Sequence, residues 1–234
     1  MAVEFLGTSN KRIDFSTIAS LQTIQQKTFL FWVNFTGVTG EVFGLSPTGA
    51  TDEEWGISFP AAGGSANRLF FYADWSTTQG QWYSTNTVST GNRFLAVSYD
   101  YGSSSNAPVL YVDGASVAVT TGQAASGTYR TGTSNSVRVG SFTSGAPSIN
   151  GVIFTGPVYN RILSASEIAD AYTSKLAIPT RRGLIFAPQL WGCAGGVAEG
   201  GTMAAGNTVA DAVSGVLGVP SGSPVFKGDT VLTF

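Results

Sequence analysis

The sequence predicts an all-β fold, a two-sheet antiparallel jelly-roll sandwich with one short helix and a glycine-rich C-terminal extension. Three observations support this prediction: short apolar runs recur between turn residues, one dipeptide between two runs is typical of a hairpin, and helical periodicity occurs only once. About ten short strands with this spacing are typical of a sandwich. The 234 residues are enough for one large domain with its own core.

The longest apolar run, Lys27–Phe35, alternates between two apolar faces. Phe29 and Phe31 fall on one face of a strand, and Leu30 and Trp32 fall on the other. We therefore expect this strand to be buried on both sides. The other predicted strands are Glu41–Leu45, Trp55–Phe59, Arg68–Trp75, Gln81–Ser84, Arg93–Asp100, Val109–Val112, Ala115–Thr120, Ser136–Phe142 and Gly151–Asn160.

A hairpin is predicted at Asp113-Gly114, between the runs that end at Val112 and begin at Ala115. A two-residue type I′ turn needs a positive φ at both central positions, and Asp-Gly adopts it readily.

The single predicted helix begins after Ser164. Ser164 and Glu167 have the spacing of a capping box, and Pro179 ends the run. One face of this helix is apolar and would pack on the sandwich: Ile168, Ala171, Tyr172 and Leu176.

Five segments together carry a family resemblance: Thr28–Phe35, Phe94–Asp100, Leu110–Gly114, Val137–Gly140 and Gly151–Ile168. In this order they resemble the laminin-G-like branch of the concanavalin A-like lectin/glucanase superfamily, and the resemblance covers roughly residues 25–176. It implies a two-sheet jelly roll, which agrees with the strand count. It also implies a biological setting, because several such domains occur in bacteriophage particle proteins and cell-surface adhesins.

The chain divides by composition into a sandwich, residues 1–178, and a C-terminal extension, residues 179–234. Residues 192–234 hold 10 of the 30 glycines and only four charged residues, so they should become ordered by docking on something else. Three alternatives remain open. The last run, 229–234, closes the sandwich by pairing with residues 2–6, it crosses to a neighbouring subunit as an added strand, or the extension is disordered.

The composition excludes several kinds of site. The absence of histidine removes Ser-His-Asp and Cys-His nucleophiles and histidine-based metal sites, and Cys193, the single cysteine, has no partner for a disulfide within the chain. A net charge of −2 gives no basic surface for nucleic acid. No apolar run approaches the roughly 18 residues of a membrane span, and no signal peptide is visible at the N-terminus.

The carboxylates indicate a protein that is not an enzyme. Glucanases of the resembled superfamily carry Glu-x-Asp-x-x-Glu on one strand, and this chain lacks that motif. Its nearest counterpart is the Asp52–Glu54 stretch, which we interpret as a solvated loop. Calcium is the common cofactor of the superfamily, and Asp100 is the one loop acid placed for it. Because no second carboxylate is near, we expect no cofactor, with a weak calcium site near Asp100 as the exception.

Aromatic residues provide the candidate ligand-binding site. Trp and Tyr rings can stack on the apolar faces of sugars while polar neighbours contact the hydroxyls. If a groove exists, the candidate glycan-binding residues are Trp75, Trp82, Tyr83, Tyr101 and Asn106. The competing interpretation is that these rings fill the core between two sheets.

These features lead to three functional hypotheses. The first is a non-enzymatic structural protein of a virion surface, a phage decoration, cement or tail component, which binds other subunits as a homo-oligomer or within a larger assembly and which has a capacity for surface glycans. The second is an independent soluble carbohydrate-binding lectin, and the third is a glycosidase of the same superfamily. We expect a location on the virion surface or outside the cell, with neither nucleic acid nor an inserted membrane as partner.

Overall fold

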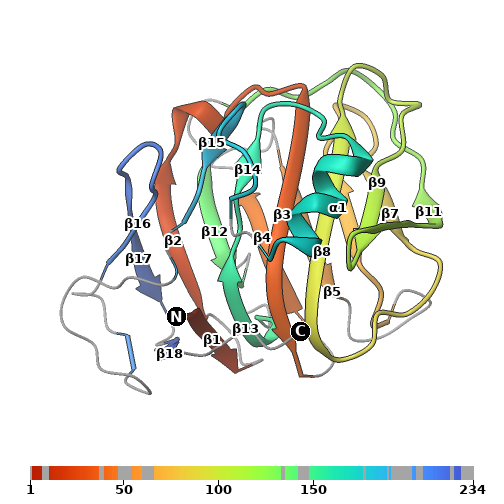
Figure 1. Ribbon diagram of the computed structural model, residues 1–234. Coiled ribbons are helices and arrows are strands. Elements are labelled where there is room, and N and C mark those ends of the chain that lie inside the picture. The colour runs from red at the N-terminus through yellow and green to blue at the C-terminus, as the bar shows by residue number, and fades with distance from the viewer. Residues whose placement is uncertain are drawn as a thin grey trace.

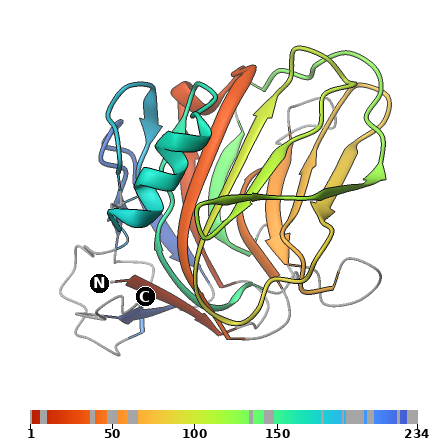
Figure 2. The ribbon, with the colours of Figure 1, turned by 45° about the vertical axis from the view of Figure 1, so that its right-hand side comes forward.

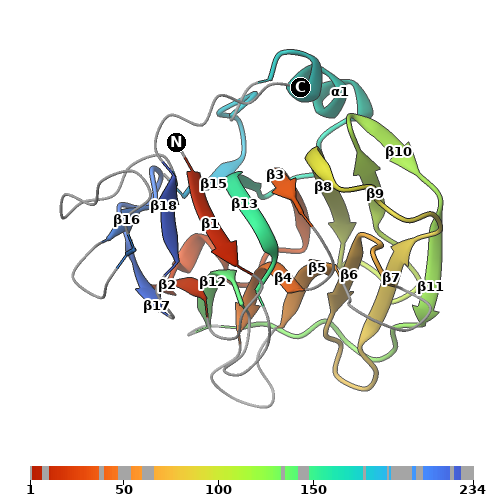
Figure 3. The same cartoon turned by 90° about the horizontal axis from the view of Figure 1, so that it is seen from below.

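The computed structural model shows two antiparallel sheets packed face to face (Figure 3). It describes residues 2–6, 11–36, 40–46, 54–59, 66–132, 135–141, 148–175, 178–188, 190, 202–203, 208–221 and 224–227, and all structural statements concern these residues. The predicted fold class, an all-β sandwich with one short helix, is confirmed.

The first sheet, here called the covered sheet, carries helix α1 on its outer face (Figures 1 and 2). Its strand order is β10-β9-β8-β3-β13-β1-β18, and β14 pairs with both β3 and β15. The bounds are β1 Ala2–Leu6, β3 Gln26–Phe35, β8 Gly91–Asp100, β9 Val109–Val112, β10 Ala115–Val117, β13 Asn150–Thr155, β14 Val158–Tyr159, β15 Leu184–Phe186 and β18 Val225–Lys227.

The second sheet, here called the open sheet, has no described helix on its outer face (Figure 3). Its order is β11-β7-β6-β5-β4-β12-β2-β17-β16. The bounds are β2 Arg12–Thr17, β4 Gly40–Ser46, β5 Trp55–Phe59, β6 Phe70–Ala73, β7 Gly80–Ser84, β11 Val119–Gln123, β12 Ser136–Gly140, β16 Val209–Ala210 and β17 Leu217–Ser221. A short 3-10 helix, Ala19–Leu21, lies between β2 and β3.

Strand β3 is buried on both faces, as its sequence predicts. Phe29 and Phe31 belong to the core between the sheets, whereas Leu30 and Trp32 belong to a second cluster beneath α1. This double burial follows from the alternation of side chains along a strand that has a sheet on one side and a helix on the other.

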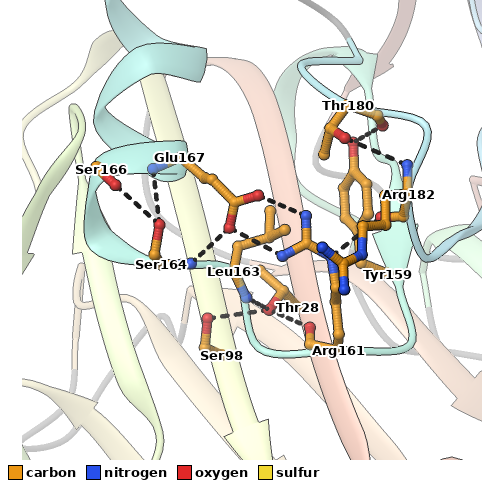
Figure 4. A network of polar contacts seen from close by, with 10 residues as sticks. All are labelled: Thr28, Ser98, Tyr159, Arg161, Leu163, Ser164, Ser166, Glu167, Thr180 and Arg182. Carbon is orange, nitrogen blue, oxygen red and sulfur yellow. Dashed lines mark hydrogen bonds and ion pairs between the residues drawn. The ribbon is translucent and has the colours of Figure 1, made fainter.

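Helix α1, Ala165–Thr173, begins with the predicted capping box. The Ser164 hydroxyl accepts from the Glu167 backbone N–H at 3.2 Å, and the Glu167 carboxylate accepts from the Ser164 backbone N–H at 2.9 Å (Figure 4). Arg161 donates to both Glu167 carboxylate oxygens, at 2.8 and 2.6 Å. Ile168 and Ala171 are buried against the covered sheet, whereas Leu176 lies outside the described residues.

The same turn is bonded to the covered sheet through Thr28 (Figure 4). The Thr28 hydroxyl donates to the Arg161 carbonyl at 2.8 Å, accepts from the Leu163 N–H at 3.0 Å and lies 3.1 Å from the Ser98 hydroxyl. The helix is therefore attached by hydrogen bonds to β3 as well as by apolar packing.

The predicted hairpin forms with positive φ at both turn residues, +52° at Asp113 and +81° at Gly114. Two predicted strands are each divided. The run Ala115–Thr120 becomes β10 in the covered sheet and β11 in the open sheet, and the run 151–160 becomes β13 and β14. Asp113 also makes a hydrogen bond within the covered sheet, since its carboxylate accepts from the Phe94 N–H at 3.0 Å.

The described parts of the C-terminal extension pair within the same chain. Strand β18 pairs antiparallel with β1, in the register Val3↔Phe226, and β17 pairs with β2, in the register Val219↔Asp14. The extension thus adds strands to both sheets. The run 229–234, which we expect to close the sandwich or to reach a neighbour, lies outside the described residues, as does Cys193.

Candidate functional site

The candidate site is a group of aromatic side chains on the outer face of the open sheet, over β6 and β7. In β6, Phe71 points into the core, and Phe70 and Tyr72 point outward. In β7, Trp82 points inward, and Tyr83 points outward. Phe70 is the register partner of Tyr83, so the three outward rings lie on the same side of the sheet. We call Phe70, Tyr72 and Tyr83 the aromatic strip.

Gly56 makes room for the Tyr72 ring of the aromatic strip. Gly56 is the register partner of Tyr72, and a Cβ atom placed on Gly56 would lie 2.5 Å from the Tyr72 ring and hydroxyl. The ring therefore lies close to the backbone of β5, and Tyr72 is half-buried. Gly44 of β4 is the register partner of Gly56, so it also adds no side chain beside the Tyr72 ring.

The Tyr83 ring of the strip is contacted by Arg68 and by strand β11. The Arg68 guanidinium lies 5.2 Å from the centre of the Tyr83 ring, and a Cβ atom on Gly122 of β11 would approach that ring to 3.0 Å. A cation near a ring face attracts it electrostatically. Tyr83 is thus contacted by Arg68 over its ring and by β11 at its edge, and it remains half-buried.

A chain of polar side chains borders the strip. Gln81, the register partner of Tyr72, donates from Nε2 to Gln79 Oε1 at 2.9 Å, and Gln79 donates to Asp74 Oδ1 at 2.7 Å. Arg130 donates to the other Asp74 oxygen at 3.2 Å. Amides, a carboxylate and a guanidinium therefore stand beside the aromatic rings, with positions fixed by one another.

Glu54 joins this polar border immediately before β5. Its pKa is raised to about 7, chiefly by burial and also by the neighbouring Asp74 carboxylate, while a hydrogen bond from Tyr72 and the charge of Arg130 oppose the shift. Tyr72 thus connects the aromatic strip to a carboxyl group that is partly protonated at neutral pH. Asp52 and Glu53 lie outside the described residues.

Three of the residues predicted from sequence lie in the core. Trp75, Trp82 and Tyr101 are only 4%, 2% and 1% exposed. They form one packed stack with Tyr99, whose ring centre is 5.2 Å from that of Trp82 and 4.7 Å from that of Tyr101. This placement corrects the expectation that these rings form a surface for sugar, because a ring inside the sandwich presents no face to a ligand.

The other two predicted residues are not brought together. Tyr83 belongs to the aromatic strip on the open sheet. Asn106 lies in the loop after β8, where its Nδ2 donates to the Asp100 carbonyl at 3.0 Å. The sequence contains a signal that separates inward from outward rings, because side chains alternate between the two faces of a strand. In Leu69–Ala73 and Gly80–Ser84, this alternation places Phe70, Tyr72 and Tyr83 on one face and Trp82 on the other.

The Asp100 carboxylate is held by hydrogen bonds within the chain. It accepts from the Gly102 backbone N–H at 2.7 Å and from Gln26 Nε2 at 3.0 Å, so hydrogen-bond donors face both oxygens. Calcium instead requires six to eight oxygen ligands. Within the described part of the chain, no group of three or more Asp, Glu, His or Cys residues could hold a metal. Among the described helices, none is long and apolar enough to cross a membrane.

The chain is similar in sequence to a known family. Residues 7–169 match the laminin-G-type profile described as the concanavalin A-like lectin/glucanases superfamily. A search among curated proteins found no match to the chain.

Solved structures share its fold at low sequence identity. A putative carbohydrate-binding protein from Bacteroides ovatus has a TM-score of 0.61 at 14% identity, with 96% of this chain and 61% of that one covered. A SAP-like pentraxin from Limulus polyphemus has a TM-score of 0.57 at 12% identity, over 79% of this chain and 86% of that one. The carbohydrate-binding module CBM40 of a Ruminococcus gnavus sialidase has a TM-score of 0.53 at 12% identity, over 74% and 97%.

Proposed function

The chain belongs to the concanavalin A-like lectin/glucanases superfamily, and we propose that it is a non-enzymatic module that binds carbohydrate on the outer face of its open sheet. The observation that carries the proposal is the aromatic strip, three half-buried rings on one face beside a row of amide groups. The names of two structural neighbours, a putative carbohydrate-binding protein and a CBM40 module, support the same class.

The chemistry of the strip suits a sugar chain. The axial C–H groups of a pyranose form apolar patches that pack on an aromatic face, and the hydroxyl groups around the ring both donate and accept hydrogen bonds. Gln79 and Gln81 place side-chain amides next to Tyr72, and each amide has both a donor N–H group and an acceptor oxygen. An open face covers less of a ligand than a pocket does, so we expect dissociation constants between about 1 mM and 1 μM, or about −4 to −8 kcal/mol.

The test is a glycan array followed by calorimetric titration of the best ligand. Tyr72→Ala and Tyr83→Ala should each weaken binding about tenfold, which corresponds to about 1.4 kcal/mol. Tyr83→Phe preserves the ring and should bind like the parent chain, which separates stacking from loss of the hydroxyl. Ser116→Ala, on the exposed edge strand β10, is the control for a substitution outside the site. A flat array, or unchanged affinity in both alanine variants, would contradict the proposal.

A second candidate function is assembly at a virion surface, and a separate observation favours it. Near one edge of the open sheet, β17 and the turn that joins it to the terminal strand β16 expose Val213, Leu217 and Val219, by 44%, 53% and 41%. A cluster of exposed aliphatic residues is typical of a surface that binds another chain. In this proposal the partner is a second copy of the chain or another subunit of the particle, and the glycan surface provides attachment.

Light scattering on the purified protein tests this second function. The parent chain should be an oligomer, and Leu217→Glu should shift it to the monomer because a charge at the contact opposes burial. Ser116→Ala on the opposite edge should leave the oligomer intact. A monomeric parent chain would contradict self-assembly and leave carbohydrate binding unaffected.

A further inference from the structure

A cleft of about 590 Å³ is lined by residues that do not belong to the aromatic strip. Its wall comes from three separate segments: the stretch leading into β3, the stretch after β11, and the residue that follows β14. The lining residues are Thr23, Ile24, Gln25, Gln26, Tyr129, Thr131 and Asn160. The volume falls in the range of about 300–1,000 Å³ that is typical of small-molecule sites. We call it the rim cleft.

Most of the described lining residues have polar side chains, and none of these residues carries a formal charge. The described lining contains two threonine hydroxyls, three side-chain amides, one tyrosine ring and one aliphatic side chain. Amides and hydroxyls supply both donors and acceptors, which match a ligand whose own groups do both. An ionic ligand would lose its hydration here without gaining a counter-charge from the lining.

The tyrosine of the wall is fixed before any ligand arrives. Tyr129 donates its hydroxyl to the Ile24 carbonyl at 3.1 Å, and its ring centre lies 4.6 Å from that of Tyr101. Behind the wall, the fully buried Lys27 ammonium donates to the same carbonyl and lies 5.5 Å from the centre of the Tyr129 ring. A ring that is already immobilised loses little conformational entropy when a ligand stacks on it.

The opposite wall is also held in place. Thr23 adopts a left-handed backbone, φ +57°, although it is not glycine, and its hydroxyl donates to the Gly132 carbonyl at 3.2 Å. Gln26 is oriented by its donation to Asp100 at 3.0 Å. Strained backbone that the surrounding contacts keep in place is common at binding sites. Gln25, Thr131 and Asn160 are exposed, so their polar groups face whatever enters.

We propose that the rim cleft is a second binding site, which takes an uncharged, hydroxyl-rich ring such as a neutral monosaccharide or disaccharide. The Tyr129 ring provides the stacking surface, and Gln25, Thr131 and Asn160 contact the hydroxyls. Between Tyr129 and Thr131, Arg130 turns the other way to pair with Asp74 in the border of the aromatic strip. One short segment therefore contributes to both sites, but the sites have different side chains.

Two-dimensional NMR titration with methyl glycosides of glucose, galactose and N-acetylglucosamine tests the proposal, with sialic acid as the charged comparison. A neutral glycoside should shift the backbone amides of Gln25 and Thr131. Thr131→Trp, which places a bulky side chain at an exposed lining position, should weaken this binding at least tenfold. Gln25→Ala should weaken it less, and it removes only an exposed amide, so it tests the site even if the tryptophan variant folds poorly.

Tyr83→Ala distinguishes the two sites, since it should leave the shifts at Gln25 and Thr131 unchanged. The absence of shifts at these amides with every neutral glycoside would overturn the proposal, as would tighter binding of sialic acid than of the neutral sugars. Loss of glycan binding in the Tyr72 and Tyr83 variants with the rim cleft still active would leave both proposals standing independently.

Discussion

Tyr72 packs against Gly56, its register partner on the neighbouring strand, so closely that a Cβ atom on Gly56 would lie 2.5 Å from the ring. The outward position of the Tyr72 ring therefore depends on the absence of a side chain at Gly56. Glycine weakens a strand interior, and an aromatic residue opposite it covers the exposed backbone.

Gly56→Ala should displace Tyr72 and disturb the aromatic strip. We expect a loss of about 1–2 kcal/mol in the free energy of unfolding, because the ring must leave a packed position, together with weaker glycan binding. Urea unfolding and glycan titration measure the two effects. Ser58→Ala, two residues along the same face, is the matched control and should change neither by more than about 0.5 kcal/mol. Equal stability and affinity for Gly56→Ala would show that the ring position is not constrained.

Glu54 should make stability fall as pH rises. Its pKa is about 7 in the folded chain against an ordinary value of 4.5, mainly because of burial. The folded state therefore holds a proton that the unfolded state has released, so the stabilising effect is complete below pH 4.5 and is lost as pH rises through 7. Glu54→Gln cannot ionise, and at pH 8 it should be more stable than the parent chain by about 1 kcal/mol after allowance for partial exposure.

Urea midpoints at pH 4 and pH 8 check this prediction. The difference between parent and Glu54→Gln should appear only at the higher pH. Asp74→Asn removes the like charge that also raises the Glu54 pKa, so it should shift the transition to lower pH. An identical pH profile for the parent chain and Glu54→Gln would contradict the assignment.

The Arg161–Glu167 ion pair should stabilise the attachment of α1 modestly and in the opposite pH range. The Arg161 guanidinium, followed by the Ser164 backbone N–H, lowers the pKa of Glu167 to about 2. The stabilisation is therefore present above pH 4.5 and is lost as pH falls toward 2. Glu167→Gln should cost about 0.5–1 kcal/mol at pH 7, because the pair is partly exposed to solvent, and almost nothing at pH 2.

Ser164→Ala provides the comparison for the helix cap. It removes the hydroxyl that accepts from the Glu167 N–H, which should cost about 1 kcal/mol in the free energy of unfolding at either pH. Equal losses for Glu167→Gln at pH 7 and pH 2 would mean that its contribution is not the ion pair.

Asp211 should hold the β16–β17 hairpin of the C-terminal extension to the segment that follows β15. It is 1% exposed, and its carboxylate accepts from the backbone N–H groups of Ala187 and Ser214, both at 2.7 Å. Asp211→Ala leaves the buried Ala187 N–H without its acceptor, so we expect a loss of about 1–3 kcal/mol. Asp170→Ala, an exposed acid on α1, is the control and should change stability little.

Limited proteolysis adds a readout specific to the extension. Asp211→Ala should be cleaved faster within residues 179–234 than the parent chain, while the sandwich stays resistant. Uniform cleavage along the whole chain would instead indicate that Asp211 stabilises the protein globally.

The regular strands and the helix could be predicted because their signals are local. The alternation in Lys27–Phe35, the Asp113-Gly114 turn and the Ser164–Glu167 cap each depend on neighbours in sequence, and all three form as expected. Strand β2 was not predicted, although Ile13 and Phe15 alternate with Arg12 and Asp14, because charged residues interrupt the apolar run. In the structure Asp14 pairs with both Arg12 and Arg138 on the outer face of the open sheet.

The candidate site was predicted only in part. Tyr83 was identified, but Trp82, its neighbour in sequence, belongs to the opposite face. The aromatic composition pointed to large rings as ligand-binding candidates, but it does not tell which face of a strand a ring occupies. That depends on which of the alternating positions along the strand face the core.

By itself, the sequence determined the fold class, the one helix, the hairpin and the absence of histidine chemistry, since these depend on periodicity, turn stereochemistry and composition. The tertiary structure alone decided which aromatic rings face solvent, that residues 225–227 pair with β1, and that three distant segments enclose the rim cleft. The physical reason is that strand pairing and burial join residues far apart in the chain, so their outcome depends on the packing of both sheets rather than on any local pattern.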